Sequence, residues 1–575
     1  MKALMTTLLG ILLVLSFGIT SQTYAANDTL VIYANSAKTL DQIISADVTG
    51  GVQAHKVYKL VSTDTTYIFG AAITATSDIK IIGKLGANNR PPCIQPDVLP
   101  DGTVPATFLI LNAKGIKAHL ENLYIIGQSI AGSVNSPNAI GIVVKEDNVR
   151  LYVNNCVFEQ WDQFAIQYTG NMDKIFIYNT KFRNMVNSAG QWYVGEAVHN
   201  SGGNATDSLV MRYNTIFCVN AYAACPVTGK ICNYFEFIHN SVVWMFKNPF
   251  FIFNVTDAKI NDNLFYAAWS GGISKQEYPW WDQLRSPEYG SIIDLDTLNL
   301  AIAKIFTPQD STNPNVRMLA EAKRKVEVKN NNYFWPKRLT DFVKTWNDTA
   351  HVDSVITVTW MNQRTSNMFT NKTVWPGFTE SGTKNVDPGF GSSIDKLMDE
   401  NAGNGVGFLK YFRAVRTGTV STEVWGYKLQ TVSGTNWVPE WPLPEAKDLR
   451  YTNTALLGGG TDGLPVGDPN WFGMPVGVKD EQVSKVPFSF TLYETYPNPF
   501  NPSTNIKFDL PENGNVSLKI YDMQGRLVQT VLDNVYKAGG TYEYKVNMNK
   551  LSSGIYLYTL QQNGRLQTKK MALLK

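Results

Sequence analysis

A short phrase that starts on asparagine recurs along the middle of the chain and constrains the fold more than any other feature. Most of its copies follow a run that alternates apolar and polar residues, such as Val149–Val153 or Lys174–Tyr178, and apolar residues follow the asparagine. Alternation with a period of two is typical of a strand with one buried face. The unit is therefore strand, asparagine corner, strand. The corner residues are Asn122, Asn155, Asn179, Asn214, Asn240, Asn263 and Asn331.

The intervals between these asparagines are 33, 24, 35, 26, 23 and 68 residues. A shortest interval with irregular additions is typical of a parallel β-solenoid, in which every coil must close while loops extend from its corners. Successive coils would stack at the strand spacing of roughly 4.8 Å. Asparagine suits such a corner because it tolerates left-handed backbone and its amide can bond the next coil. An antiparallel β-sandwich with asparagine-rich turns is the alternative, although two-residue hairpin turns are scarce here.

The segment from Ser77 to Gly473 resembles the right-handed parallel β-helix, or pectate-lyase-like, superfamily. The resemblance rests on the asparagine corners, on "IKIIG" at Ile79–Gly83, and on the closing phrases at Asn385–Phe390 and Gly458–Trp471. It implies an all-β, right-handed parallel β-helix. It implies little about activity, because this fold carries lyases, hydrolases, adhesins and passive surface proteins.

The last eighty residues form a second pattern. Val516, Leu518 and Ile520 alternate with polar residues, as in a half-exposed antiparallel sheet, so we predict a small antiparallel β-sandwich. The same text resembles the C-terminal sorting domain of the type IX secretion system of Bacteroidetes and their relatives. This resemblance implies recognition by that secretion machinery, export across the outer membrane, and an extracellular or cell-surface location. The residues that carry it include Tyr496, Pro497, Asn498, Pro499, Gly525, Gly554, Lys570 and Lys575.

The start of the chain is typical of a secretory signal peptide, with Lys2, an apolar run over Leu8–Ile19 and small residues ending at Ala25. No later stretch is long and apolar enough to predict a membrane span. The predicted organisation is a signal peptide at 1–25, an N-terminal cap at 27–76, a β-helix at 77–475 with an insertion at about 270–325, a linker at 476–490, and the sandwich at 491–575.

The composition narrows the classes of partner. Charged residues are 17% of the chain, aromatic residues are 12%, and the net charge is +3, so no basic stripe supports nucleic-acid binding. Few charges and many aromatic side chains favour sugars or other neutral surfaces. The five cysteines allow a local disulfide, such as Cys225 with Cys232, or a role as small core residues.

Catalytic motifs of this fold are scarce. An Asp pair beside a Gly-His-Gly turn is not found, nor is the Asp-His and Arg-x-Pro-x-x-Arg set of one lyase family. If the strands after each corner stack in register, Lys145, Tyr168 and Asn200 would form one line, with Gln167 and His199 on the opposite parity. Lys145 and His199 are the candidate bases for a lyase, although a solvated loop charge and a satisfied polar residue explain them more simply.

Aromatic side chains near the corners are candidate sugar platforms, because the apolar faces of sugar rings stack on them. Core packing is the alternative for those within coils. We predict no cofactor, with calcium at Asp462 and Asp468 as the one candidate, although the Gly and Pro around them also explain a tight turn. The glycan-binding candidates are Trp161, Trp192, Tyr193, Trp280, Trp281 and Asp282.

Three functions remain open at this point. The first is a surface-displayed β-helix that binds an extracellular polysaccharide or acts in adhesion. The second is a polysaccharide lyase or another carbohydrate-active enzyme, and the third is a structural envelope protein. A groove lined by aromatic and charged side chains across several coils would favour the first two.

Overall fold

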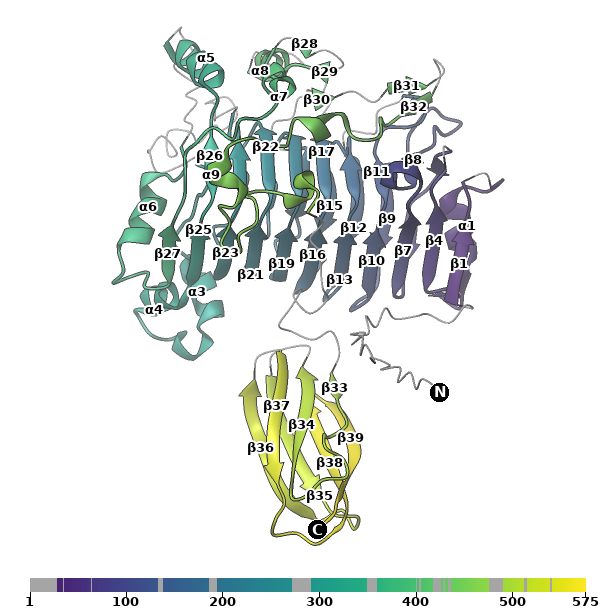
Figure 1. Cartoon of the computed structure of the whole chain (residues 1–575), viewed down its shortest axis with the longest axis vertical. Coiled ribbons are helices and arrows are strands. Elements are labelled where there is room, and N and C mark those ends of the chain that lie inside the picture. The colour runs from purple at the N-terminus through teal and green to yellow at the C-terminus, as the bar shows by residue number, and fades with distance from the viewer. Residues whose placement is uncertain are drawn as a thin grey trace, which may run out of the picture. The chain divides into compact units, whose positions relative to one another are not determined.

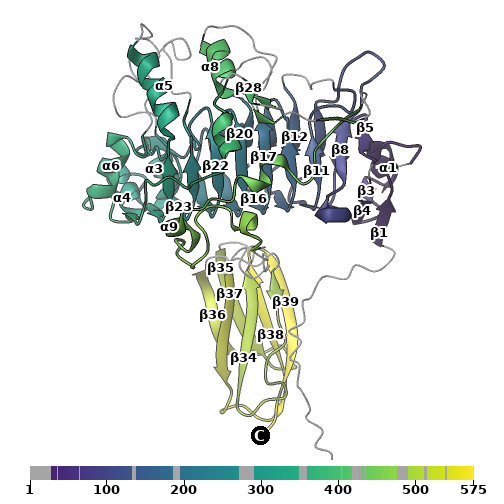
Figure 2. The same cartoon turned by 45° about the horizontal axis from the view of Figure 1, so that its top comes forward.

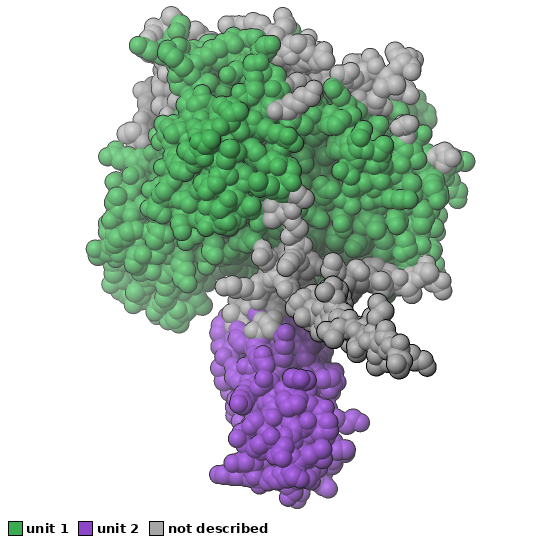
Figure 3. Space-filling model, viewed as in Figure 1, with its two compact units in different colours: residues 1–476 green, residues 477–575 purple. Residues whose placement is uncertain are grey.

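The computed structural model describes residues 28–34, 36–63, 65–132, 138–185, 194–270, 291–348, 359–399, 401–402, 405–416, 426–427, 430–432, 436–474, 490–510, 514–537 and 540–575. The chain divides into two compact units, Met1–Val476 and Gly477–Lys575 (Figure 3). The predicted signal peptide, and the predicted linker except for its last residue, lie outside the described residues. None of the helices described is long and apolar enough to cross a membrane.

Three parallel sheets build the first unit, and strands of successive coils lie side by side from β1 to β27 (Figure 1). In the described residues the eleven-stranded sheet holds β1 (Thr29–Ile32), β4 (Val57–Val61), β7 (Ile79–Lys84), β10 (Lys117–Glu121), β13 (Arg150–Asn154), β16 (Asp173–Tyr178), β19 (Thr206–Arg212), β21 (Cys232–Ile238), β23 (Asp257–Asn261), β25 (Lys325–Lys329) and β27 (Phe378–Ser381). The nine-stranded sheet holds β5 (Tyr67–Phe69), β8 (Cys93–Pro96), β11 (Tyr124–Ile126), β14 (Val157–Glu159), β17 (Lys181–Met185), β20 (Thr215–Val219), β22 (Ser241–Met245), β24 (Leu264–Tyr266) and β26 (Asn332–Phe334). The five-stranded sheet holds β6 (Ile73–Ala75), β9 (Thr107–Leu111), β12 (Ile140–Val144), β15 (Phe164–Tyr168) and β18 (Glu196–Asn200).

The alternation of the sequence sorts the side chains between core and surface. Leu151 and Val153 are fully buried, whereas Tyr152 between them points outward and is half-buried. Ile175 and Ile177 are likewise fully buried, since parallel pairing keeps each residue beside its equivalent in the next coil. The predicted parallel β-helix is therefore confirmed, and the antiparallel alternative for this unit is wrong.

The asparagine corners occupy two different positions. Asn122, Asn155 and Asn179 have positive φ, and in the later coils this backbone position is held by Tyr213, His239, Asp262 and Asn330. The other four asparagines lie one residue further on and are buried. Their side chains form a ladder, with Asn214 Nδ2 donating to Asn240 at 2.9 Å, Asn240 to Asn263 at 3.1 Å and Asn263 to Asn331 at 2.9 Å. Both positions close a coil, but only the second builds a hydrogen-bonded column through the interior.

The solenoid begins earlier than the boundary at residue 77 that we predicted. β1, β4, β5 and β6 already pair in the parallel sheets, so the described residues between 28 and 76 form the first coils and not a separate cap. Within this stretch α1 (Leu40–Ala46) buries Leu40 and Ile44 against the end of the core. This helix supplies the predicted capping, because it shields apolar residues that the next coil would otherwise cover.

The described part of the predicted insertion carries two helices, α3 (Leu300–Phe306) and α4 (Val316–Lys323). They pack against Ala205 and Ile231 near the starts of β19 and β21. The interruption does not break the solenoid, because β25 pairs with β23 and Asn331 still bonds Asn263. Later elements are α5 (Lys337–Asp348), α6 (Gln363–Thr370), α7 (Ser392–Lys396), α8 (Phe408–Arg416) and α9 (Thr454–Leu457).

After β27 the chain returns along the outer face of the nine-stranded sheet and covers it. α7 and α8 lie over β22 and β20 (Figure 2), where Trp244 Nε1 donates to the carbonyl of Ile394 at 2.8 Å and Tyr411 donates to Asn220 at 2.9 Å. Arg183 on β17 reaches Glu445 with two hydrogen bonds of 2.8 and 2.9 Å. This cover gives the unit a second apolar core outside the coils.

Residues 459–471, the C-terminal strap, then cross the corners of several coils. The backbone of Thr461 donates to Asp262 at 2.8 Å, and the backbone of Asp468 donates to Ser241 at 2.8 Å. Gly467 has a φ of +92°, and a Cβ there would lie 2.6 Å from the Ser241 hydroxyl. The strap therefore needs glycine where it presses on the corner.

Smaller elements complete the first unit: β2 (Val48–Thr49), β3 (Val52–Gln53), β28 (Asn401–Ala402), β29 (Gly405–Val406), β30 (Gly426–Tyr427), β31 (Gln430–Val432) and β32 (Asn436–Val438), with 3-10 turns at Ala87–Asn89, Pro308–Asp310, Pro444–Lys447 and Pro469–Phe472.

The second unit is the predicted antiparallel β-sandwich. Its strands are β33 (Thr491–Leu492), β34 (Ser503–Leu510), β35 (Gly514–Tyr521), β36 (Leu527–Lys537), β37 (Gly540–Asn547), β38 (Gly554–Gln562) and β39 (Arg565–Leu573). Among the residues described, β33-β34-β37 form one sheet and β36-β35-β38-β39 form the other. Val516, Leu518 and Ile520 are fully buried between them, as their alternation predicts.

Candidate functional site

The predicted line across the five-stranded sheet is formed only in part. Tyr168 pairs in register with Asn200 and Gln167 with His199, as expected. Tyr168 pairs on its other side with Val144, however, so Lys145 is one residue beyond the line and is exposed in the following loop. Tyr168 and Asn200 are fully buried, and the Tyr168 hydroxyl donates to the carbonyl of Pro226 at 2.9 Å. The line is therefore part of the interior and not a sugar-binding surface.

His199 lies in an ion pair that does not suit a general base. Its Nδ1 is 2.5 Å from the buried Glu196 carboxylate, and its ring stacks on Phe164 at 4.5 Å. Burial alone would lower the pKa of His199, but Glu196 and Cys225 raise it to about 11. A ring that stays protonated at neutral pH has no lone pair with which to accept a substrate proton. The structure favours a structural cation at this position.

The cysteines do not form the disulfide that we considered. All five are free and buried, including Cys225 and Cys232. Burial raises the pKa of the Cys225 thiol even though His199 lies beside it. These thiols are core residues, since a reactive cysteine needs exposure and a lowered pKa.

The predicted sugar platforms have different outcomes. Trp161 is fully buried in the core and its indole N–H donates to the carbonyl of Ile125 at 3.2 Å, so the sugar-platform prediction is wrong for this residue. Within a solenoid coil a large aromatic side chain fills the interior, which was the alternative. The other candidates, Trp192, Tyr193, Trp280, Trp281 and Asp282, lie outside the described residues.

The two predicted calcium ligands hold the C-terminal strap. Asp462 accepts from His239 Nε2 at 3.1 Å, and the buried Asp468 accepts from the Thr215 hydroxyl at 2.7 Å. No three metal-binding side chains come together in the part of the chain described. Both aspartates therefore attach the strap to the coils.

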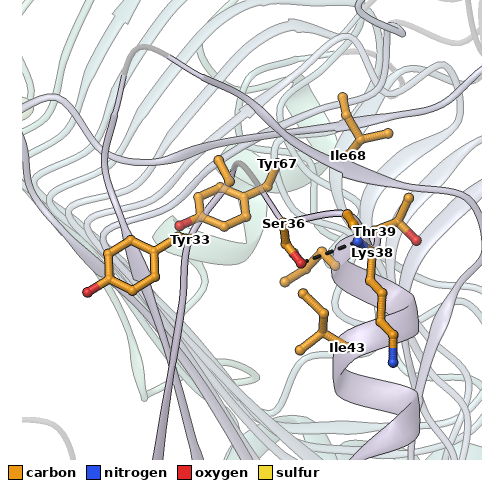
Figure 4. Close-up of a pocket in the computed structure, with 10 residues that line it drawn as sticks. Tyr33, Ser36, Lys38, Thr39, Ile43, Tyr67 and Ile68 are labelled. Atoms are coloured by element: carbon orange, nitrogen blue, oxygen red, sulfur yellow. Dashed lines mark hydrogen bonds between the residues drawn. The ribbon is translucent and has the colours of Figure 1, made fainter.

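A shallow pocket of about 110 Å³ lies at the start of the solenoid between β1 and α1 (Figure 4). Tyr33, Ser36, Ile43 and Tyr67 line it, and the Ser36 hydroxyl accepts from the backbone of Lys38 at 3.3 Å. The Tyr67 hydroxyl is already engaged, because it donates to the carbonyl of Ile32 at 2.7 Å. The pocket is small and lies at the end of the solenoid, and nothing in its lining indicates a particular ligand.

A different surface brings charged and aromatic side chains together in order. β10, β13 and β16 pair in register, so each outward position recurs in three adjacent strands. Lys117, Arg150 and Lys174 form a cationic column, and two residues along the strands His119, Tyr152 and Phe176 form an aromatic column. A third column holds Glu121, Asn154 and Tyr178. We call these nine residues the β10-β13-β16 patch.

The aromatic column is a continuous stack. The ring centroids of His119 and Tyr152 are 6.0 Å apart, and those of Tyr152 and Phe176 are 4.9 Å apart at an interplanar angle of 18°. The exposed fraction falls along the stack, from 33% for the His119 side chain to 4% for Phe176. Ring edges and the outer face of His119 are therefore what a ligand would contact.

The charges of the patch are only partly balanced. Lys174 lies 3.3 Å from Asp207 and His119 lies 3.1 Å from Glu121, whose pKa the histidine hydrogen bond lowers. Lys117 is exposed and has no ion-pair partner among the residues described. Lys117 is therefore the member of the cationic column whose charge an anionic ligand would balance.

Tyr178 adds a polar group at the margin of the patch. Burial raises the pKa of its hydroxyl well above the ordinary value, and this buried hydroxyl finds no hydrogen-bond partner within the described residues. Such a group is costly to leave unpaired. Because the hydroxyl is buried, a ligand on the surface would not contact it directly.

The sequence contained a signal for this patch that we did not use. Tyr152 and Phe176 lie at the outward positions of the alternating runs that predict the strands. Outward positions are normally polar, so aromatic residues at the same outward position of two successive coils suggest a binding surface. Their contact across the coils could not be inferred without the register.

Comparison with known proteins identifies only the second unit. Residues 494–573 match the family model described as "Secretion system C-terminal sorting domain". Neither a curated protein nor a solved structure matches the chain. The sorting residues Tyr496, Pro497, Asn498 and Pro499 fall within the matched segment, together with Gly525, Gly554 and Lys570. The second unit therefore belongs to the type IX sorting domains, and the protein is exported across the outer membrane to the cell surface or the medium.

Proposed function

We propose that this exported β-helix protein binds an extracellular polysaccharide along the β10-β13-β16 patch without cleaving it. The observation that carries the proposal is the register of the three strands, which places a cationic column beside an aromatic stack. Both columns repeat at the strand spacing of about 4.8 Å. A repeating ligand can therefore make the same contact on successive coils.

The chemistry of the columns indicates an acidic glycan. Cationic side chains attract carboxylate or sulfate groups, and aromatic groups contact the apolar C–H faces of sugar rings. The neighbouring column supplies an amide partner in Asn154. The excess of unbalanced cation at Lys117 favours an acidic over a neutral chain.

The proposal of binding without cleavage is supported by the state of the residues that we considered as bases. His199 is held as a cation by Glu196, and Lys145 is an exposed loop residue that does not join the stacked line. The lyase alternative requires a base beside the sugar C5 proton. An assay for unsaturated uronate keeps that alternative testable.

The test uses the purified full chain in affinity gels that contain polygalacturonate, alginate, chondroitin sulfate or neutral dextran. We expect retardation by one or more acidic polymers, with binding reduced about tenfold in Tyr152→Ala and severalfold in Lys117→Gln. Added salt should weaken wild-type binding more than that of Lys117→Gln, because one fewer ionic contact is screened.

Lys259→Gln is the matched control. Lys259 is an exposed lysine on the same sheet, but it pairs in register with Glu236 on one side and Glu327 on the other. Its removal should leave retardation unchanged. Equal loss of binding in Lys259→Gln and Lys117→Gln would contradict the proposed position, and new ultraviolet absorbance with an acidic polymer would replace binding with lyase activity.

A further inference from the structure

The two outer faces of the C-terminal sandwich differ sharply in polarity. On the β33-β34-β37 sheet, residues alternate with buried ones such as Ile506 and Phe508, and the outward residues of β34 and β37 are polar. The aromatic ring of Tyr493, just after β33, lies beside Lys507 on this face. This face consists of Ser503, Asn505, Lys507, Asp509, Glu543, Lys545 and Asn547. It is an ordinary solvated sheet face.

The outer face of the β36-β35-β38-β39 sheet carries an apolar row. Leu527 pairs with Tyr521, Tyr521 with Leu557 and Leu557 with Lys570, so one row crosses all four strands. Ile555 lies beside Leu557 on the same face. We call Tyr521, Leu527, Ile555 and Leu557 the apolar row.

The row is not part of the core of the unit. Its residues alternate with Ile520, Tyr556 and Tyr558, which fill the interior of the sandwich. Leu527 is 52% exposed and Ile555 is 51% exposed. Single exposed apolar residues are common, but a contiguous set across several strands marks a contact surface.

The end of the row adds a charge. Lys570 is exposed beside Leu557 and has no ion-pair partner among the residues described. Lys519, which lies on the same face two strands away on β35, is by contrast paired with Asp533 at 2.8 Å. An apolar surface with an unbalanced cation at one end is complementary to an apolar surface with a carboxylate at its rim.

We propose that the apolar row and Lys570 form the face by which the sorting domain docks on the secretion machinery. The family assignment makes that machinery a partner of this unit. The row offers this partner an apolar contact surface, and Lys570 adds a positive charge at its end. The partner surface is apolar and carries an acidic side chain opposite Lys570. The polar β33-β34-β37 face remains in solvent during docking.

Threonine substitutions test the row while respecting the strands. Ile555→Thr with Leu557→Thr removes apolar surface but keeps residues with high strand propensity. The full chain is produced in a type IX-secreting bacterium, and its amounts at the surface, in the medium and in the periplasm are measured. We expect the exported fraction to fall about tenfold, with accumulation in the periplasm, because docking loses two apolar contacts.

Lys507→Thr with Glu543→Thr on the opposite face is the matched control, and it should export like the wild type. Since a destabilised sandwich would also block export, Lys570→Glu provides a second variant on an exposed side chain. It should reduce export, whereas Lys570→Arg should preserve it. Export of the Ile555/Leu557 variant at the control level would overturn the proposal, as would equal loss in both double variants.

A second copy of the chain is the competing occupant of the row. Sedimentation of the purified full chain decides this point. Dimers that dissociate in the Ile555/Leu557 variant, together with normal export of that variant, would assign the row to self-association and refute docking on the machinery. Monomeric wild-type protein with an export defect in the variant is the result that we expect.

Discussion

Replacing Asn240 with leucine tests whether the buried asparagine ladder contributes more to stability than the exposed corner asparagines do. Asn240 is buried, its Oδ1 accepts from the backbone N–H of Asn214 at 3.0 Å and from its Nδ2 at 2.9 Å, and its own Nδ2 donates to the carbonyl of Met211 at 3.0 Å. Leucine has a similar size but makes none of these bonds. Two to three buried polar groups would lose a partner at about 1–3 kcal/mol each, so the free energy of unfolding should fall by about 3–5 kcal/mol.

Asn155→Ala is the matched variant at an exposed corner. Asn155 has a φ of 49°, and its Nδ2 donates to Asn122 at 2.7 Å on the surface. Alanine at this left-handed position should cost about 1–2 kcal/mol. A loss for Asn240→Leu that is no larger than the loss for Asn155→Ala would refute the argument that the buried ladder outweighs corner geometry.

Tryptophan fluorescence during urea unfolding is the suitable assay. All 14 tryptophans precede residue 476, so the signal reports the β-helix unit and not the sandwich. The urea concentration at the midpoint should be compared with that of the wild type only where the slope of the free energy against urea concentration is unchanged. A solenoid that unfolds in segments would change this slope as well.

Two further predictions concern the covering segments. Arg183→Met leaves Glu159 and Glu445 buried without their shared cation, so stability should fall by about 3–5 kcal/mol, and adding Glu445→Leu should recover part of this loss in the same urea assay. Burial alone would lower the pKa of His239, but Asp462 raises it. A raised pKa means that the protonated ring stabilises the folded state. The stabilisation by His239 should therefore be full below about pH 6.5 and lost as the pH rises through the pKa of His239 in the folded protein. Limited proteolysis of the strap should therefore accelerate at high pH, and Asp462→Asn should flatten this dependence; identical pH profiles would contradict it.

Local patterns predicted most of the architecture. The alternation around Leu151 and Ile175 gave strands with one buried face, and the asparagine intervals gave stacked coils, because both depend on neighbours in sequence or on a repeat that must close. The sorting domain could also be predicted from the sequence, since its strands and turns lie within one continuous segment. The β-helix boundary was placed too late because the first coils lack the asparagine corner.

The functional surface depended on the register between coils. Lys145 was predicted to align with Tyr168, but one residue of difference moves it out of the strand and into a loop. Trp161 was predicted at a surface and lies in the core, since intervals between corners that vary from 23 to 68 residues hide which position of one coil faces the next.

The sequence by itself determined the repeating strands, the export domain and the parity of each side chain, because these follow from short-range periodicity. Only the tertiary structure decided that Lys117, Arg150 and Lys174 form one column. It also decided that the part of the first unit after β27 covers the nine-stranded sheet. The physical reason is that contacts between coils join residues tens to hundreds of positions apart. Their pairing is set by the common packing of all coils, which no local pattern encodes.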